Sequence, residues 1–146
     1  MNREKFWALV DDSVAVDPEQ TIENLREALG ELSARELEKF HDQLSEVLFE
    51  LDRRDLARQK YRFFGAYDGP GETGDHFLFA RCAVVLSGSS RFTEIQHNPA
   101  QFSGSWSYRA QDVFDAVEDA YEDLTREEWD YASEVDYETG ANAAAW

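Results

Sequence analysis

The chain has 146 residues, of which 42% are hydrophobic and 14% aromatic, and its formal net charge is −17. This length is typical of one domain, and the aromatic content is too high for a disordered acidic tail, so we expect a single folded domain over residues 1–146. The negative charge opposes contact with the phosphate backbone and with anionic membranes. We therefore expect neither direct nucleic-acid binding nor membrane binding.

The sequence favours a cytoplasmic location. Its apolar runs are far shorter than the roughly 20 residues that cross a bilayer, and the first residues show no export signal. Cys82 is the sole cysteine, so no internal disulfide can form and an oxidising compartment gains no support. Eleven of the fourteen basic residues are arginine, a bias typical of GC-rich genomes such as those of actinobacteria.

Two helices are predicted near the N-terminus. Residues 3–14 carry a broad apolar stripe that includes Phe6 and Trp7. Asp17 followed by Pro18 is a helix start signal, with the aspartate as N-cap and the proline in the first helical position. The second helix is therefore expected over residues 18–29.

A capping box marks the start of a third, longer helix. In the sequence Ser33-Ala34-Arg35-Glu36, the serine hydroxyl and the glutamate carboxylate can each accept a hydrogen bond from a free amide at the helix start. Apolar residues then recur at helical spacing to Leu51. We expect about five turns, and an extension of the helix to Tyr61 is the alternative.

The middle of the chain predicts a loop, two helices and an irregular segment. Glycine and proline are concentrated in residues 65–74, which predicts a loop. Residues 76–86 are almost continuously apolar and longer than a usual strand, so a helix is favoured over a pair of buried strands. A short helix is expected at 91–96. Residues 98–108 predict an irregular aromatic segment packed on the body.

Helical spacing resumes over residues 110–124 and predicts a further helix. Thr125-Arg126-Glu127-Glu128 matches a second capping box, so we expect a last helix with Trp129, Ala132 and Val135 facing inward. Together the elements predict an all-α or predominantly α fold, a compact bundle of about six helices with a glycine-rich loop and an aromatic irregular segment. The predicted shared core consists of Phe6, Leu25, Leu29, Phe40, Leu44, Val47, Leu48, Val84 and Val117.

The order of these features resembles an uncharacterised, largely actinobacterial family, number 4240 in the domain-of-unknown-function series. The resemblance covers most of the chain and rests on four stretches: Phe6-Trp7-Ala8-Leu9-Val10, Gly74-Asp75-His76-Phe77 leading to Arg81 and Gly88, Phe92 to Asn98-Pro99, and Ala120-Tyr121-Glu122-Asp123-Leu124-Thr125. His76 and Ala83 depart from the acidic residue and the tryptophan that are common in the family at those positions. The resemblance implies a fold but no activity, cofactor or catalytic residue.

The strongest candidate for catalysis is Asp75 with His76, because a carboxylate beside an imidazole can fix its tautomer for acid–base chemistry. No nucleophile motif accompanies the pair, and an aspartate at a helix start also serves as a plain cap. His41, His76 and His97 are scattered and follow no metal-ligand spacing, so we expect no metal and no cofactor. Cys82 lies among apolar residues, which favours burial over nucleophilic use.

The glycine-rich loop also has the composition of a phosphate cradle. It lacks the Gly-Lys-Ser/Thr sequence of a nucleotide site, and Glu72 and Asp75 would repel phosphate. A plain turn is therefore the favoured interpretation.

Charge is distributed unevenly along the chain. A basic cluster near the end of the long helix is expected to complement the helix dipole and to pair with Asp52 and Asp55; it comprises Arg53, Arg54, Arg58, Lys60 and Arg62. Residues 112–138 contain twelve acidic residues and one basic residue, a net −11 of the total −17. Five of these acids, three to four residues apart, form a continuous acidic strip: Asp115, Glu118, Asp119, Glu122 and Asp123.

The acidic strip leads to the favoured function, a non-enzymatic interaction or regulatory domain that binds a basic protein partner. One alternative is an inhibitor or immunity-type protein that imitates the charge of nucleic acid, because electrostatic complementarity raises association rate and specificity. The other is a small enzyme that uses Asp75 and His76 beside the glycine-rich loop. A solvated helix face explains the same charges without any partner, and the sequence leaves the oligomeric state open.

Overall fold

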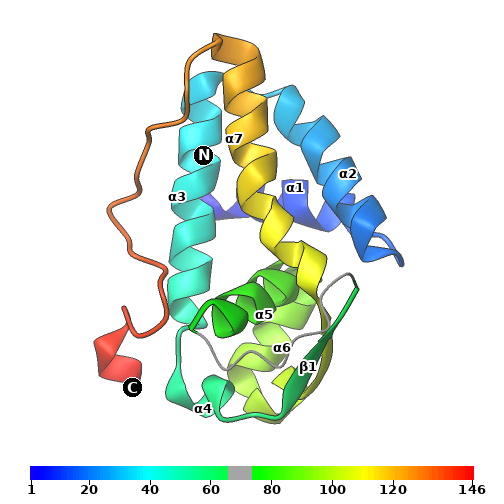
Figure 1. Ribbon diagram of the computed structural model, residues 1–146, viewed down its shortest axis with the longest axis vertical. Coiled ribbons are helices and arrows are strands. Elements are labelled where there is room, and N and C mark those ends of the chain that lie inside the picture. The colour runs from blue at the N-terminus through cyan, green and yellow to red at the C-terminus, as the bar shows by residue number, and fades with distance from the viewer. Residues whose placement is uncertain (66–73) are drawn as a thin grey trace.

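The computed structural model describes residues 1–65 and 74–146 (Figure 1). Its elements follow in the order α1 (Arg3–Ser13), α2 (Pro18–Gly30), α3 (Ala34–Glu50), α4 (Arg54–Ala57), β1 (Tyr61–Phe64), α5 (Gly74–Leu86), α6 (Ser89–His97), the 3₁₀ turn η1 (Pro99–Phe102), β2 (Gly104–Ser107), η2 (Tyr108–Gln111), α7 (Asp112–Thr125) and η3 (Ala143–Ala145). The predominantly α fold is confirmed. The predicted glycine-rich loop lies outside the described residues except at its two ends.

The three longer helices α2, α3 and α7 form one half of the molecule, with α7 between the other two (Figure 1). Helix α1 crosses behind them, and α5 and α6 lie in the other half together with β1. No helix in the described part of the chain is long and apolar enough to cross a membrane.

The predicted core is confirmed. All nine of its residues are fully buried and belong to one hydrophobic cluster that all the helices share. Helix α5 contributes almost entirely apolar residues to this cluster, and the helix favoured for residues 76–86 is confirmed. Burial on several sides of a helix gives a continuous apolar run instead of a stripe.

The start signals predicted for the second and third helices operate as expected. The Asp17 carboxylate accepts a hydrogen bond from the Glu19 amide at 3.0 Å at the start of α2. At the start of α3, the Glu36 amide donates to the Ser33 hydroxyl at 3.3 Å, and the Ser33 amide donates to the Glu36 carboxylate at 3.0 Å. Local polar sequence therefore sets where these helices begin.

The predicted extension of the third helix to Tyr61 is wrong. Helix α3 ends at Glu50, and the chain continues through the one-turn α4 into β1. Strand β1 pairs in parallel with β2, which places Phe63 opposite Trp106. The segment 98–108, predicted as irregular, therefore contains a strand. Tyr61 and Phe63 are half-buried while their neighbours are exposed, the two-residue alternation of a strand rather than a helix.

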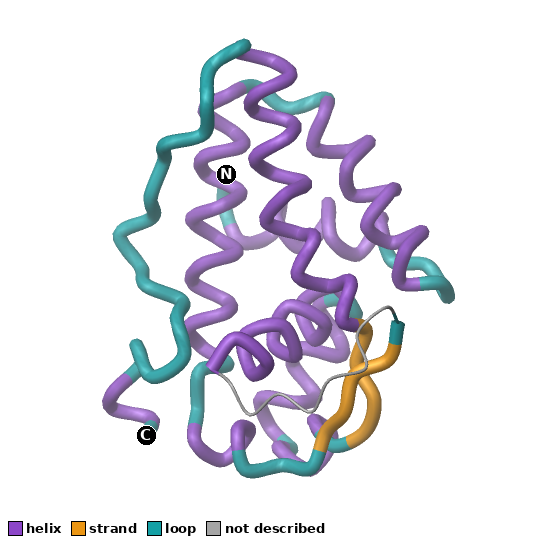
Figure 2. Tube along the Cα trace, viewed as in Figure 1, coloured by secondary structure: helices purple, strands orange, loops and turns teal. Residues whose placement is uncertain are grey.

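The predicted last helix is also wrong. Arg126 ends α7 in the left-handed region (φ 62°), and most of residues 126–142 run without a helix alongside α3 (Figure 2). The Thr125 hydroxyl donates to the Tyr121 carbonyl oxygen at 2.8 Å and accepts from the Glu127 amide at 3.1 Å, but the chain after Arg126 does not continue as a helix. A helix here would also bring its many carboxylates together at i,i+4 spacing, where like charges repel. We call residues 126–146 the C-terminal segment.

Candidate functional site

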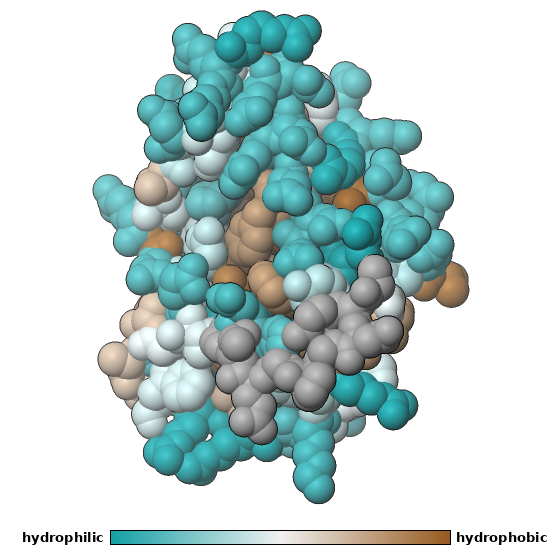
Figure 3. Space-filling view, in the orientation of Figure 1, coloured by the Kyte–Doolittle hydropathy of each residue, from teal (hydrophilic) through white to brown (hydrophobic). Residues whose placement is uncertain are grey.

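The predicted acidic strip lies on the outer face of α7. Asp115, Asp119 and Glu122 occupy positions i, i+4 and i+7, on the side opposite the buried Val113 and Val117. All five residues of the strip are exposed. The part of the molecule around the end of α7 is covered mainly by hydrophilic residues (Figure 3). The structure therefore brings the predicted residues together on one accessible surface.

Arginines lie close to two of the five carboxylates. Arg26 of α2 reaches across to Asp119 and forms an ion pair that joins the two helices. Arg126 lies 3.8 Å from Asp123, but both side chains are more than four-fifths exposed, so solvent screens this pair strongly. Only the Arg26 contact has the geometry of a fixed interaction.

The other three carboxylates form no ion pair with any residue that the structure describes. Glu122 accepts a hydrogen bond from the Trp129 amide at 3.2 Å, whereas Asp115 and Glu118 have no partner of this kind. Partial burial raises the pKa of Glu118, and the negative charges of Asp115, Glu122 and Asp119 raise it further. The strip therefore carries uncompensated negative charge.

A groove lies beside the strip, between α2 and α7. It encloses about 620 Å³, and its lining includes the small residues Gly30, Ala116 and Ala120 together with the ion pair of Arg26 and Asp119. A Cβ atom placed on Gly30 would meet no atom within 4 Å, which shows that the space above this residue is open. Leu124 lines the same groove with 53% of its surface exposed. The sequence alone did not reveal this groove, because its walls come from two helices that are distant in the chain.

The structure separates the proposed catalytic pair. Asp75 is exposed in the first turn of α5, whereas His76 is buried and its ring meets Phe63 edge-on at 5.6 Å. Consecutive helical residues point about 100° apart, which accounts for the different surroundings.

The other two histidines also lie in different places. His41 is buried on α3, and burial lowers its pKa. His97 is exposed on α6, with Nδ1 2.8 Å from the Thr93 carbonyl oxygen. Among residues 1–65 and 74–146 no group of three or more histidine, cysteine or acidic side chains could hold a metal ion.

Cys82 is fully buried in α5, as predicted from its apolar neighbours. Burial raises the pKa of its thiol to about 12. The thiolate is the nucleophilic form of cysteine, so the folded chain keeps this side chain in its unreactive form near neutral pH.

The predicted basic cluster is only partly paired as expected. The Arg53 guanidinium binds Asp55, with Nε 3.0 Å from Oδ1, and also donates to the Gln96 carbonyl oxygen. The predicted pairing of the cluster with Asp52 is wrong, because this carboxylate is buried and accepts hydrogen bonds from the C-terminal segment. The cluster also lies beyond the end of α3, so it contributes no cation to the last turn of that helix.

Two buried charges hold the C-terminal segment, a role that the sequence indicated for neither of them. Arg81 is fully buried, and its Nη1 donates to the Leu48 and Tyr137 carbonyl oxygens at 2.8 and 2.9 Å. Its guanidinium also lies 4.8 Å from the centre of the Phe77 ring. Burial lowers the pKa of Arg81, while the charge of Asp52 opposes that shift. The sequence held one signal for this role, because Arg81 is a charged residue in the middle of the largely apolar helix α5.

Asp52 anchors the very end of the chain. Its Oδ1 accepts hydrogen bonds from the Gly140 amide at 3.1 Å and from Trp146 Nε1 at 2.9 Å, and its Oδ2 accepts from the Asn142 amide at 2.9 Å. A fully buried carboxylate with three donors is well satisfied. Asp52 and Arg81 therefore have structural roles that their positions in the sequence did not indicate.

One protein family has a model that matches residues 1–139, and its description is "Protein of unknown function (DUF4240)". The match covers nearly the whole chain, so the chain belongs to this family. No curated protein and no solved structure matches the chain.

Proposed function

We propose that this member of the DUF4240 family is a non-enzymatic interaction domain that binds a basic segment of a partner protein. The acidic strip of α7 and the groove between α2 and α7 together form the binding surface. The domain acts in the cytoplasm, where the lone Cys82 stays reduced. The observation that carries the proposal is the open groove lined by Asp119, Glu122 and Asp123, of which Glu122 forms no ion pair with any residue that the structure describes.

The position of the acids within α7 argues against a purely solvating role. Glu122 and Asp123 lie in the last turn, where the helix dipole is negative and the helix has no basic residue. An acid at this end costs roughly 0.3–1 kcal/mol at low ionic strength. Glu118 adds like-charge repulsion with Glu122 at i,i+4, and the neighbouring acids raise its pKa. Glu118, Glu122 and Asp123 therefore destabilise α7 in the isolated domain, and a basic partner would offset that cost.

The groove specifies the partner further. Small residues line it at Gly30, Ala116 and Ala120, and the exposed Leu124 offers an apolar contact to a side chain of the partner. Asp119, Glu122 and Asp123 line the same groove and face the solvent around it. An amphipathic helix that presents a leucine between lysines or arginines matches both features.

The test uses a fluorescent helical peptide of alternating Leu and Lys/Arg turns as the probe, with fluorescence anisotropy as the measurement. The variant Asp115→Asn/Glu118→Gln/Glu122→Gln should weaken peptide binding about tenfold, since three exposed charge pairs at roughly 0.5 kcal/mol each amount to about 1.5 kcal/mol. Parent affinity should fall as salt screens the surface. Folding should persist, because the substitutions relieve repulsion within α7.

A matched control distinguishes loss of the proposed surface from a mere change in net charge. Glu4→Gln/Asp12→Asn/Asp75→Asn neutralises three exposed acids elsewhere, so both triple variants carry −14 instead of −17. Equal losses in the two variants would show that only overall charge attracts the peptide, and the proposed surface would be wrong.

Gly30→Leu tests the groove independently of charge. The substitution fills the open space above Gly30 and suits a helix better than glycine does, so the melting midpoint should hold or rise while peptide affinity falls. Unchanged peptide affinity would remove the groove from the proposal.

A further inference from the structure

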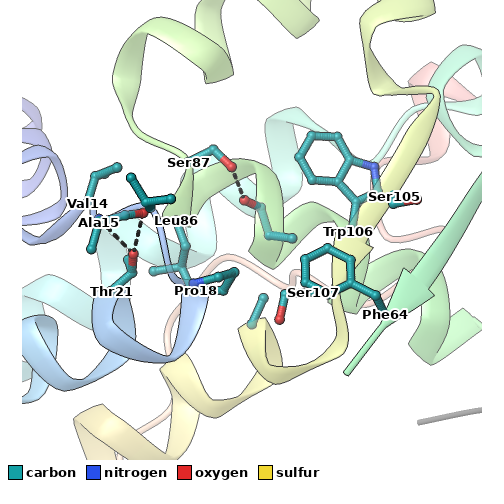
Figure 4. A pocket seen from close by; sticks show the side chains of 13 residues that line it. Val14, Ala15, Pro18, Thr21, Phe64, Leu86, Ser87, Ser105, Trp106 and Ser107 are labelled. Atoms are coloured by element: carbon teal, nitrogen blue, oxygen red, sulfur yellow. Dashed lines mark hydrogen bonds between the residues drawn. The ribbon is translucent and has the colours of Figure 1, made fainter. Parts of the chain in front are cut away.

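A second cavity lies at the other end of α2, where four parts of the chain meet (Figure 4). It encloses about 300 Å³ and is lined by the α1–α2 connection and the first turns of α2, by the end of α5, by the ends of β1 and β2, and by η2. In Figure 4, Phe64 and Trp106 stand on one side of the cavity, and Val14 and Thr21 stand on the other. Pro18 and Gly30 are twelve residues apart along α2, so this cavity lies about 18 Å from the acidic groove.

The lining is unusual for so acidic a protein. Of the described residues that line the cavity, none is charged at neutral pH. Three of the five large hydrophobic side chains that are exposed in the described part of the chain belong to it: Val14, Val16 and Phe64. Burying a charge here would remove its hydration without offering an opposite charge in return. The cavity therefore selects against ions and for an uncharged, mainly apolar occupant.

Four hydroxyl groups line the cavity, and three are already engaged. The Ser87 hydroxyl donates to the Ala83 carbonyl oxygen at 2.7 Å, Thr21 Oγ1 accepts from the Ala15 amide at 2.9 Å, and Ser105 Oγ accepts from Arg62 Nε at 2.8 Å. The fourth belongs to Ser107, a residue that is only 7% exposed.

The Ser107 hydroxyl makes no hydrogen bond with any side chain or backbone group in residues 1–65 and 74–146. This oxygen is not fully buried, so water can bind it through the cavity, and the polar group of a ligand can replace that water.

We propose that this cavity binds a small neutral molecule with an aromatic or branched apolar body and one hydrogen-bonding group, which pairs with the Ser107 hydroxyl. The cavity has about the volume of ten water molecules, at roughly 30 Å³ each, which suits a ligand the size of a single bicyclic ring. The apolar body lies between Trp106 and the α1–α2 connection. The site is independent of the acidic surface in position and in chemistry.

The experiment titrates the ¹⁵N-labelled full chain with indole and, separately, with indene, which has the same shape but no N–H group. Amide signals of cavity residues such as Thr21, Leu86 and Ser107 should shift together, with an indole dissociation constant of about 1 mM or tighter. Ser107→Ala should weaken indole binding by about three- to tenfold and leave indene binding unchanged, since one neutral hydrogen bond is lost.

Ser87→Ala is the matched control, because it removes a lining hydroxyl that is already bonded to Ala83. It should leave indole affinity unchanged. Ala83→Leu should abolish binding by filling the cavity; should this variant not fold, Ala110→Leu fills it from η2.

Three results would overturn the ligand proposal. They are scattered shifts that do not converge on the cavity, equal losses in Ser107→Ala and Ser87→Ala, and full indole binding in the folded filled variant. Concentration-dependent broadening of the same signals without indole would assign the cavity to a second copy of the chain, and would also overturn the proposal.

Discussion

The carboxylate of Asp52 holds the end of the chain, and Asp52→Asn changes this contact with almost no change of shape. The carboxylate accepts two hydrogen bonds at Oδ1 and one, from the Asn142 amide, at Oδ2. An asparagine side chain can keep the first two, but its amide group then faces the Asn142 N–H, donor against donor. One hydrogen bond to a charged group is lost, and one buried donor is left without a partner.

The structure gives a magnitude for this loss. A hydrogen bond to a charged group contributes roughly 1.5–3 kcal/mol, and an unsatisfied buried donor costs a similar amount, of which relaxation recovers part. We expect Asp52→Asn to lower the free energy of unfolding by about 3 kcal/mol. For a chain of this length the melting midpoint should fall by about 10 °C.

Thermal denaturation and hydrogen exchange provide the assay. Exchange should accelerate in residues 137–146 of Asp52→Asn before it accelerates elsewhere, because these residues lose their anchor. Asp55→Asn is the control, since its ion pair with Arg53 is partly exposed and contributes at most about 1 kcal/mol. Equal destabilisation by the two substitutions, or unchanged exchange at the C-terminus, would refute the reasoning.

Three further predictions follow from buried side chains. Leu44→Ala should lower the free energy of unfolding by about 2–5 kcal/mol in denaturant melts, because Leu44 is fully buried in the shared core. Cys82 should react slowly with a thiol reagent in the folded protein and rapidly after denaturation. Burial lowers the pKa of His41, so the unfolded chain binds more protons, and stability should fall as the pH drops through about 6.5. His41→Gln should reduce that loss in melts compared between about pH 7 and pH 5.

The two capping-box sequences show what local sequence can and cannot predict. Ser33 and Glu36 follow a turn, so their side chains are free to start α3, as predicted. Thr125 carries the same motif at the end of an existing helix, where its hydroxyl donates to the Tyr121 carbonyl oxygen and accepts from the Glu127 amide without starting a new helix. The motif shows that the side chains can cap a helix, whereas the packing of the residues that follow decides whether a helix forms there.

The irregular C-terminal segment could not be predicted, because residues on distant elements hold it. The rings of Trp129, Tyr131 and Tyr137 each lie within about 6 Å of His41 on α3. Arg81 binds the backbone of the same segment from α5. Neither helical periodicity nor capping motifs contain information about such long-range contacts. The sequence patterns therefore favoured a helix that is absent from the folded chain.

The parallel pair of strands was missed for a related reason. Four residues carry little periodic signal, and the pairing of Phe63 with Trp106 joins segments more than forty residues apart. The acidic strip needed only helical spacing and exposure, so the sequence predicted it correctly as a surface. The two cavities needed the relative placement of several elements, which the sequence did not provide.

The C-terminal segment also defines one edge of the proposed binding surface. Tyr137 stacks on Phe114 with ring centres 5.1 Å apart, and the ring of Trp129 meets Tyr121 at 5.1 Å. The Trp129 amide further binds Glu122 within the strip. One side of α7 is therefore covered, and the strip faces open solvent on the side of α2, where the groove lies.

Because Asp52 anchors this segment, we expect it to affect peptide binding at the proposed surface as well as stability. Release of the segment would expose the ring of Phe114 and free Glu122 from its backbone donor. A free Glu122 loses the orientation that places its charge beside the groove. We therefore expect Asp52→Asn to weaken binding of the basic peptide at a temperature where the helices remain folded, although Asp52 itself lies outside the strip. Unchanged peptide affinity in this variant would mean that α7 alone arranges the strip.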